Sequence, residues 1–359
     1  MTSSSGQTFS FGTKAESLIR IAPLLTLFKV PRSRHFTVSE WRIDPDRQLR
    51  ELEDHFADDV VIVRSSAQGE DGEVGSMAGR FDSIGDIAAT PDALRGAINQ
   101  VIASYDRTSD DGEDQVLIQS MLRDVLMSGV LFTHDLNTGG PYYVINYDDE
   151  TGRTDTVTSG GVYSNRTLVV HRGALDAVQS PRFQALLAAT VELELAIPGQ
   201  GLDIEFAVDR DLGVHLLQVR RMTAQPTPDD EMPGRVDEAI GRIRAFVQSR
   251  FAPMAGIPGR RSIFGQMPDW NPAEMIGRAP RPLALSLYRH LITDRAWRQA
   301  RGQMGYSEPN GMPLLVSLGG QPYIDVRLSF HSFLPAGLDE GIAEKLVNAW
   351  LNRLSAYHQ

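Results

Sequence analysis

The chain has 359 residues, enough for two or three domains, and its hydrophobic content of 42% and charged content of 23% are ordinary for a globular protein. A net charge of −11 argues against double-stranded nucleic acid or an anionic membrane as a partner, and the absence of cysteine excludes disulfides, thiolate metal sites and cysteine nucleophiles. No apolar run approaches the ~20 residues that span a bilayer, and the first residues lack the apolar core of a signal peptide, so we expect a cytoplasmic protein.

The first predicted helix begins after Thr13, which is a favourable N-cap residue, and its apolar face starts with Leu18 and Ile21. Lys14 falls in the first turn, where a cation opposes the helix dipole by roughly a few tenths of a kcal/mol. Two interpretations stay open at this point. Either an anion also lies at the helix start, or Lys14 is a solvated surface residue.

A strand followed by a small-residue loop is the next informative feature. After a short predicted strand at 36–43 and a helix at 45–56, the β-branched run Val60–Val63 predicts a buried strand. Arg64 ends it, and the loop beyond closes on Ser76–Gly79. An arginine fork beside unobstructed backbone amides suits a phosphate, whereas the alternative is an ordinary strand exit with a surface arginine.

The region after a helix at 91–105 and an exposed acidic loop at 109–114 predicts an antiparallel sheet. Apolar strands are predicted at 115–122 and 128–135, and 142–147 is the hairpin partner of the second. His134 is interpreted as a solvated or hydrogen-bonded side chain rather than a metal ligand. Further along, Thr167–His171 predicts a strand and Phe183–Ala196 a helix.

Residues 201–209 predict a strand whose alternation places Asp203 and Glu205 on one face. The returning strand at 214–220 carries Gln218 and Arg220 on one face, so a hairpin brings the four side chains together. Two carboxylates near a phosphate suit Mg²⁺. The alternative is the polar outer face of an antiparallel sheet.

The best linker is 224–234, which contains three prolines and an acidic run. Helices are predicted beyond it at 236–251, 283–300 and 342–354. A strand is predicted at 321–330, with one polar face formed by Tyr323, Asp325, Arg327 and Ser329. That face lines a polar substrate pocket in one interpretation and is a solvated sheet face in the other.

Several of these stretches occur together in a recognisable order. GTKAESL, VRSSAQGED…GSMAGRFDS, VLIQSML…SGVLFTHDLNTG, TSGG and LDIEFAVD…LLQVRRMT follow one another between residues 11 and 226. In order and spacing they resemble the ATP-grasp nucleotide-binding domain of the phosphoenolpyruvate synthase and pyruvate phosphate dikinase family. The resemblance implies an α+β ATP-grasp fold of two lobes, 1–110 and 111–226, followed by a smaller mixed α/β region at 235–359.

The resemblance also implies a nucleotide cleft with ATP and Mg²⁺ as cofactors. The implied lining residues are Lys14, Arg64, Gln119, Gly129, Thr133, Asp203, Glu205, Gln218 and Arg220. Lys14 and Arg64 would hold the ATP phosphates, the backbone around 119–122 would face the adenine, and Gly129 and Thr133 would line the cleft. Asp203, Glu205 and Gln218 would hold Mg²⁺ or ribose, while Arg220, with Arg64, would act on the transferring phosphates.

The sequence departs from the family's pattern beyond this domain. None of the histidines (35, 55, 134, 171, 215, 290, 331 and 358) has the context of the family's phosphoacceptor motif, and the family's C-terminal barrel is missing. The segment 97–114 is short for the family, and Arg107 is a candidate there for a further phosphate-contacting arginine. Residues 266–335 resemble the middle region of capsule-associated relatives, including the L-glutamine kinase type, which implies an amide or amino-acid substrate.

Three functional hypotheses follow. The first is a phosphotransferase component that binds ATP and Mg²⁺ and passes a phosphoryl group, through a histidine carrier on another domain or chain, to a small acceptor such as an amino acid amide or pyruvate. In that case the chain is a fragment or one subunit of a split system. The second is a non-catalytic ATP-binding regulatory module, and the third is a one-step ATP-grasp ligase that forms ADP.

Overall fold

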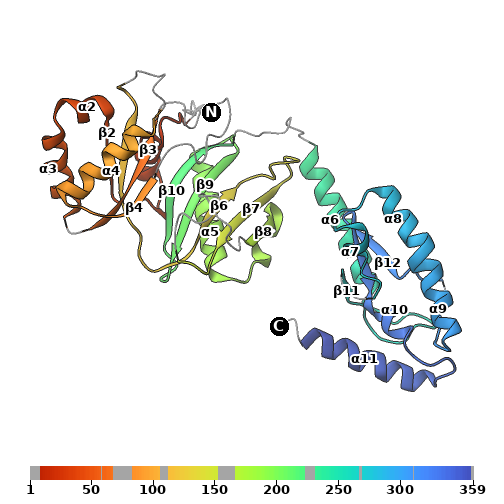
Figure 1. Ribbon diagram of the computed structural model, residues 1–359. Helices are drawn as coiled ribbons and strands as arrows, with labels where there is room; N and C mark the ends of the chain where they lie inside the picture. Colours follow the sequence, from red (N-terminus) through yellow and green to blue (C-terminus); the bar gives the residue numbers. More distant parts are fainter. Residues whose placement is uncertain are drawn as a thin grey trace. The chain divides into compact units, whose positions relative to one another are not determined.

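The computed structural model describes residues 9–57, 59–67, 83–105, 112–152, 166–222, 231–266, 269–309 and 311–356. The chain divides into two compact units, Met1–Met232 and Pro233–Gln359. In Figure 1 the first unit runs from red to green and the second from green to blue. The division falls inside the proline-rich stretch 224–234.

A four-stranded antiparallel sheet with the order β2-β5-β3-β4 forms the first part of the N-terminal unit. Its strands are β2 (Ser33–Thr37), β3 (Val60–Ser66), β4 (Ser83–Ala88) and β5 (Gln115–Ser120). The helices that pack on it are α2 (Val38–Ile43), α3 (Pro45–Phe56) and α4 (Pro91–Ala103). Val61 and Val63 of β3 are buried in the core that these helices form with the sheet. Because alternate strand residues face opposite sides, Arg64 points away from this core.

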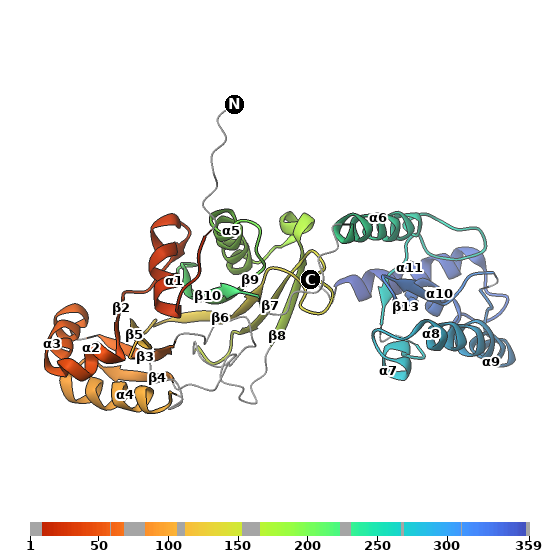
Figure 2. The same cartoon turned by 90° about the horizontal axis from the view of Figure 1, so that it is seen from above.

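A six-stranded sheet with the order β1-β10-β9-β6-β7-β8 forms the rest of the unit, and only the short β1 pairs in parallel. Its strands are β1 (Phe28–Lys29), β6 (Val125–Phe132), β7 (Tyr142–Asp148), β8 (Arg166–His171), β9 (Leu202–Asp209) and β10 (Val214–Arg221). Helices α1 (Lys14–Ile21) and α5 (Pro181–Ala196) lie on the same side of it, as Figure 2 shows. Short 3₁₀ turns cover Ala22–Leu24 and Arg172–Ala177.

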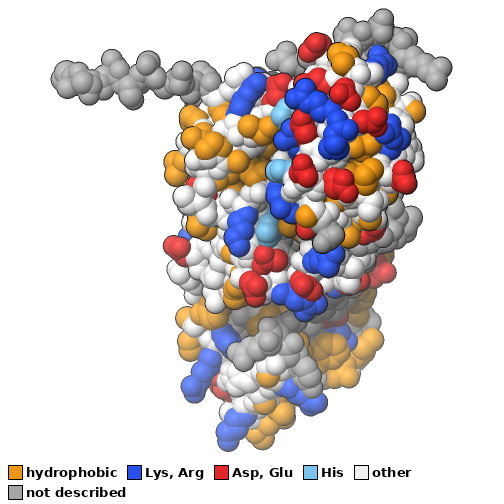
Figure 3. All heavy atoms as spheres, turned by 90° about the vertical axis from the view of Figure 1, so that its left-hand side faces the viewer, with side chains coloured by type: hydrophobic (Ala, Val, Ile, Leu, Met, Phe, Trp, Pro, Cys, Tyr) orange, Lys and Arg blue, Asp and Glu red, His pale blue; other side chains and the backbone are white. Residues whose placement is uncertain are grey.

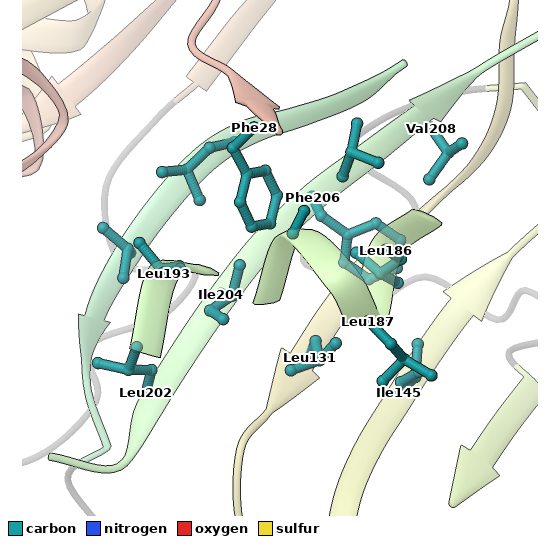
Figure 4. Close-up of a cluster of buried hydrophobic side chains, with 14 of the residues drawn as sticks. Phe28, Leu131, Ile145, Leu186, Leu187, Leu193, Leu202, Ile204, Phe206 and Val208 are labelled. Atoms are coloured by element: carbon teal, nitrogen blue, oxygen red, sulfur yellow. The ribbon is translucent and has the colours of Figure 1, made fainter. Parts of the chain in front are cut away.

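The side chains of β9 alternate between the hydrophobic core under α5 and the opposite face of the sheet. Ile204 and Phe206 are fully buried with Leu186 and Leu187 of α5, and Figure 4 shows these side chains directed toward one another. Burial of a large apolar side chain contributes roughly 1.5–3 kcal/mol, so this packing fixes the face that β9 turns toward the helix. The intervening residue, Glu205, therefore projects from the opposite face of the sheet.

The C-terminal unit combines helices with a small antiparallel sheet of order β11-β13-β12. Its strands are β11 (Phe264–Gly265), β12 (Leu315–Leu318) and β13 (Gln321–Asp325). Its helices are α6 (Met232–Ser249), α7 (Pro272–Ile276), α8 (Pro282–Tyr288), a π-helical stretch (Arg289–Ala296), α9 (Trp297–Gln303), α10 (Val326–His331) and α11 (Glu340–Ala356). The fully buried Trp297 lies in one hydrophobic core of this unit, and α11 packs through a second.

The α+β class is confirmed, but several predicted elements are wrong in detail. The stretch 36–43 is mostly helical, because Thr37 and Glu40 form a capping box that starts α2 right after β2. The strand at 115–120 does not join the hairpin of 125–132 and 142–148; it lies in the four-stranded sheet. The division between the two sheets therefore does not coincide with residues 110 and 111.

The predicted strand at 321–330 is also wrong beyond Asp325. The Asp325 carboxylate accepts hydrogen bonds from the backbone N–H groups of Arg327 and Leu328, at 3.1 and 3.4 Å, and so caps helix α10. Arg327 and Ser329 consequently do not share a strand face with Tyr323. Both interpretations of that face, the polar pocket and the solvated sheet face, are therefore wrong, because the strand ends at Asp325.

Candidate nucleotide site

Side chains from the two sheets of the N-terminal unit meet in one buried charged cluster. Arg64 comes from β3 of the four-stranded sheet. Asp203 and Glu205 come from β9, and Gln218 and Arg220 from β10, of the six-stranded sheet. The predicted β9–β10 hairpin is present, and its register pairs Glu205 with Gln218 and Asp203 with Arg220.

A β-bulge gives this hairpin its local shape. The register shifts between Leu216 and Gln218, so Leu217 is the extra residue of β10. The Leu217 carbonyl accepts a hydrogen bond from Nη1 of Arg64 at 3.3 Å. The bulge thus provides a backbone acceptor for the arginine while the side chain of Gln218 stays opposite Glu205.

Two ion pairs form the centre of the cluster. Nη2 of Arg64 donates to Oε2 of Glu205 at 2.6 Å and lies 3.5 Å from Oε1 of Gln218. Nε of Arg220 donates to Oδ2 of Asp203 at 2.8 Å. All of these side chains are largely buried, so water screens their charges poorly.

The electrostatic surroundings keep Glu205 ionised. Burial by itself would raise the pKa of this carboxyl, but the charges of Arg64, Lys14 and Arg220 and the hydrogen bond from Arg64 together hold the pKa below its usual range. Among the described residues, the cations of Lys14, Arg64 and Arg220 thus lie near the carboxylates of Asp203 and Glu205. Guanidinium and ammonium groups gathered in one place suit an anion with several oxygens.

Of the two interpretations of Lys14, that of a solvated surface residue is wrong. Lys14 is buried and lies close enough to Glu205 to lower the pKa of that carboxyl. The first amides of α1 already have acceptors, since Ala15 N–H donates to Oγ of Ser66 at 3.0 Å and Glu16 N–H donates to Oγ1 of Thr13 at 3.3 Å. The carboxylate of Glu205 is therefore one anion that stabilises a lysine in the first helical turn.

Gln119 lies on the face of the four-stranded sheet that carries Arg64. It pairs with Ile62 of β3, two residues before Arg64, and directly opposed residues share a face. The side chain is only 2% exposed, and its Nε2 has no hydrogen-bond partner among the described residues. A buried amide donor without an acceptor costs about 1–3 kcal/mol, so this group needs a further acceptor.

Gly129 and Thr133 have structural contacts in the six-stranded sheet. A Cβ atom on Gly129 would lie 2.0 Å from the Asn146 carbonyl oxygen and 2.8 Å from Cα of Tyr147. The Thr133 hydroxyl accepts a hydrogen bond from Leu202 N–H at 2.9 Å, next to Asp203. Strand packing alone thus explains the glycine, while Thr133 fixes the end of β6 beside the cluster.

Asp203, Glu205 and Gln218 suit a magnesium ion only if a bound ligand supplies the remaining oxygen donors. The part of the chain that the structure describes contains no group of three or more His, Asp or Glu side chains arranged to hold a metal. Asp203, Glu205 and Gln218 supply two carboxylates and an amide oxygen, which are the hard donors that Mg²⁺ prefers. Phosphate oxygens would complete the coordination in a nucleotide complex.

The sequence did not reveal the supporting polar contacts. Thr13 donates from Oγ1 to Oε1 of Gln115 at 2.7 Å, and the Tyr105 hydroxyl donates to the Gln115 carbonyl at 2.5 Å. Ser66 N–H donates in turn to the Tyr105 oxygen at 3.3 Å. These bonds fix the start of α1 against the end of β3. In the sequence, the only signal for them was the pair of small polar residues, Ser65 and Ser66, that follows Arg64.

A second, partly buried polar cluster was also missed. Arg172 forms a bidentate pair with Glu194, at 2.8 and 3.0 Å, and donates to the Thr133 carbonyl at 2.9 Å. The Tyr143 hydroxyl donates to Glu194 at 2.6 Å, and burial together with this bond raises the pKa of Tyr143. The cluster connects α5 to the ends of β6 and β7.

The predicted loop closure at 76–79, the TSGG turn at 158–161 and Arg107 lie outside the described residues.

One face of the same unit carries both kinds of charge. Figure 3 views the face that carries α2, α3 and α4, and basic and acidic side chains are intermingled across it. No helix within the described parts of the chain is both long and apolar enough to cross a membrane.

The comparison with protein families identifies a nucleotide-binding domain. Residues 45–172 match the family described as pyruvate phosphate dikinase, AMP/ATP-binding domain. Arg64, Gln119, Gly129 and Thr133 lie inside the matched residues, whereas Lys14 and the β9–β10 hairpin lie outside. Together with the two-sheet α+β fold, the match supports an ATP-binding domain of the ATP-grasp type in this chain.

Individual relatives are distant. The prodigiosin synthesizing transferase PigC of Serratia marcescens is 27% identical over 207 residues, which cover 47% of this chain and 23% of that protein. D-alanyl-alanine synthetase A of Vibrio cholerae is similar in structure with 14% identity and a TM-score of 0.37, over 63% of this chain and 58% of that chain. The L-amino acid ligase of Bacillus licheniformis has 12% identity and a TM-score of 0.35, over 58% of this chain and 42% of that chain. The chain therefore spans under a quarter of the curated relative and about half of these solved structures.

Proposed function

We propose that the chain is an ATP- and Mg²⁺-dependent phosphotransferase component. The observation that carries this proposal is the buried cluster in which Arg64 of one sheet meets Glu205 of the other, with Lys14 and Arg220 beside them. Phosphoryl transfer depends on positioning and on stabilisation of negative charge by cations and a metal, more than on covalent participation by the protein. The cluster provides cations and hard oxygen donors in the same place.

Each member has a proposed role. Lys14 and Arg64 hold the ATP phosphates, and Arg220 neutralises charge on the transferring group. Asp203, Glu205 and Gln218 face Mg²⁺ or the ribose, and the unpaired Nε2 of Gln119 donates to the base. When ATP binds, its phosphates share Arg64 with Glu205, so one carboxylate oxygen becomes available to a metal.

The acceptor chemistry is proposed to involve a second protein component. The phosphoryl group passes to a histidine on another domain or chain, and from there to a small acceptor such as an amino acid amide or pyruvate. The second candidate, a one-step ligase that forms ADP, is favoured by the presence of a ligand-sized pocket in the C-terminal unit of the same chain.

Product analysis tests the proposal. The chain is incubated with β-labelled or γ-labelled ATP and Mg²⁺, with and without a separately supplied phosphohistidine domain of a dikinase. We expect AMP to form only when that domain is present. ADP formation by the chain alone would instead establish the ligase, and ATP binding without turnover in any mixture would establish a non-catalytic nucleotide-binding module.

A further inference from the structure

The C-terminal unit contains a pocket that has no role in the nucleotide site. It has a volume of about 550 Å³, which is within the range of roughly 300–1,000 Å³ for small-molecule sites. Most of its lining is apolar and comes from α6, the loop before β11, β11 itself and β12. The apolar lining residues are Ile243, Val247, Phe251, Ile263, Phe264 and Leu318.

Helix α6 forms one wall of the pocket and is only partly buried. None of the 18 residues of α6 is fully buried, although Ile243 and Val247 form part of an apolar stripe along it. Phe246 contacts Phe264 with ring centroids 5.9 Å apart, and this contact attaches the helix to the sheet. At the end of the helix Phe251 is 54% exposed, so an aromatic ring stands at the opening.

The polar part of the lining contains one charged group. The Ser262 hydroxyl donates to Asp325 at 3.1 Å, and the Tyr323 hydroxyl donates to Gln321 at 3.2 Å, so both already have partners. Arg261 differs, because its guanidinium contacts only the neutral side chains of Ser355 and Asn352, at 2.8 and 3.4 Å, among the described residues. Arg261 lines the pocket, and a guanidinium whose described partners are all neutral suits the anionic group of an amphipathic ligand.

We propose that this pocket binds a small amphipathic anion, with an apolar body against Val247 and Phe264 and a single carboxylate or phosphate group at Arg261. The inference goes beyond the proposed function and does not depend on it, because the pocket belongs to the C-terminal unit and the nucleotide cluster to the N-terminal unit. Binding to the pocket itself does not require ATP, so the two proposals fail separately.

The test uses calorimetric titration of the full 359-residue chain, without ATP, with decanoate, decyl phosphate and decanol. At least one of the two anions is expected to bind at a single site at least tenfold more tightly than decanol, and the tighter one identifies the anionic group. Equal affinity for decanol and for both anions, or no saturable binding of any of them, would overturn the proposal.

Matched variants locate the site. Arg261→Gln is expected to reduce the anion affinity at least tenfold and to leave decanol binding unchanged, whereas Arg244→Gln, on the exposed side of α6, is expected to bind like the wild type. Val247→Phe fills the pocket and is expected to abolish binding, while Val236→Phe on the same helix lies outside the lining and retains it. Circular dichroism verifies that each variant is folded. Equal behaviour of the two arginine variants, or of the two valine variants, would contradict the assignment.

Discussion

Glu205 is the residue on which the charge balance of the candidate site depends. It is ionised because Arg64, Lys14 and Arg220 surround it, although burial alone would favour its neutral form. The sequence predicted this residue through strand alternation, which placed it on one face with Asp203. The predicted hairpin also brought Asp203 and Arg220 together. The strand pattern did not predict the pair of Glu205 with Arg64, because Arg64 is 141 residues away along the chain and on another sheet.

The pH dependence of stability tests the charge state of Glu205. Its folded-state pKa is lowered relative to an unfolded value of about 4.3, so the unfolded chain binds the proton more readily. The stabilisation is fully present above pH ~4.3 and is lost as the pH falls through the folded-state value. We expect Glu205→Gln to lose less stability than the wild type between pH 6 and pH 3, measured as urea midpoints.

Glu53→Gln, an exposed change on α3, serves as the control and should follow the wild type. If the Glu205→Gln and wild-type curves run parallel through the acid range, the cations do not hold this carboxyl ionised.

At the scale of elements, local sequence patterns predicted where strands and helices lie better than they predicted which strands pair with each other. The β9–β10 hairpin follows from alternation on each side of a short turn at 211–213, and the helix predicted at 45–56 has the bounds of α3. The pairing of β5 depends on contacts with β2 and β3, which are distant in sequence and leave no local signal. At Asp325 the strand pattern continued into a helix, because a capping carboxylate changes the backbone without interrupting the apolar alternation.

Gly129 provides a test at this scale. Close packing against β7 and lining of the nucleotide cleft are two different roles for it, and they predict different effects of a substitution. If close packing against β7 requires the glycine, Gly129→Ala places a Cβ 2.0 Å from the Asn146 oxygen and destabilises the unit by about 1–3 kcal/mol. We expect that loss in urea unfolding, with the ATP affinity of the folded protein unchanged.

Gly96→Ala is the matched control for this substitution. Nothing lies within 4 Å of a Cβ at Gly96 in helix α4, so alanine should stabilise the chain by roughly 0.5–1 kcal/mol. Weaker ATP binding by Gly129→Ala without a loss of stability would instead place the glycine at the nucleotide.

At the scale of the whole molecule, the charged cluster and the apolar pocket belong to different units. The N-terminal unit contains the cluster built from two sheets, and the C-terminal unit contains the pocket under α6. The sequence indicated the first through an ordered set of motifs. It gave no sign of the second, since a pocket between a helix and a sheet depends on how closely they pack, and the α6 pattern is that of any amphipathic helix.

The central claim is that ATP binds at the cluster between the two sheets, and Arg220 offers the most direct measurement of it. Arg220→Gln keeps a hydrogen-bond donor for Asp203 but removes the positive charge proposed to contact the phosphates. Loss of a charge-assisted hydrogen bond costs about 1.5–3 kcal/mol, which corresponds to roughly a 10- to 100-fold change in affinity. The neighbouring Arg221 is exposed at the end of the same strand, so Arg221→Gln is the matched control.

Isothermal titration of Mg²⁺–ATP into the wild type and both variants decides the question. We expect Arg220→Gln to bind ATP at least tenfold more weakly than the wild type, and Arg221→Gln to bind it like the wild type. Equal affinity of all three proteins for ATP would contradict the placement of the nucleotide at this cluster.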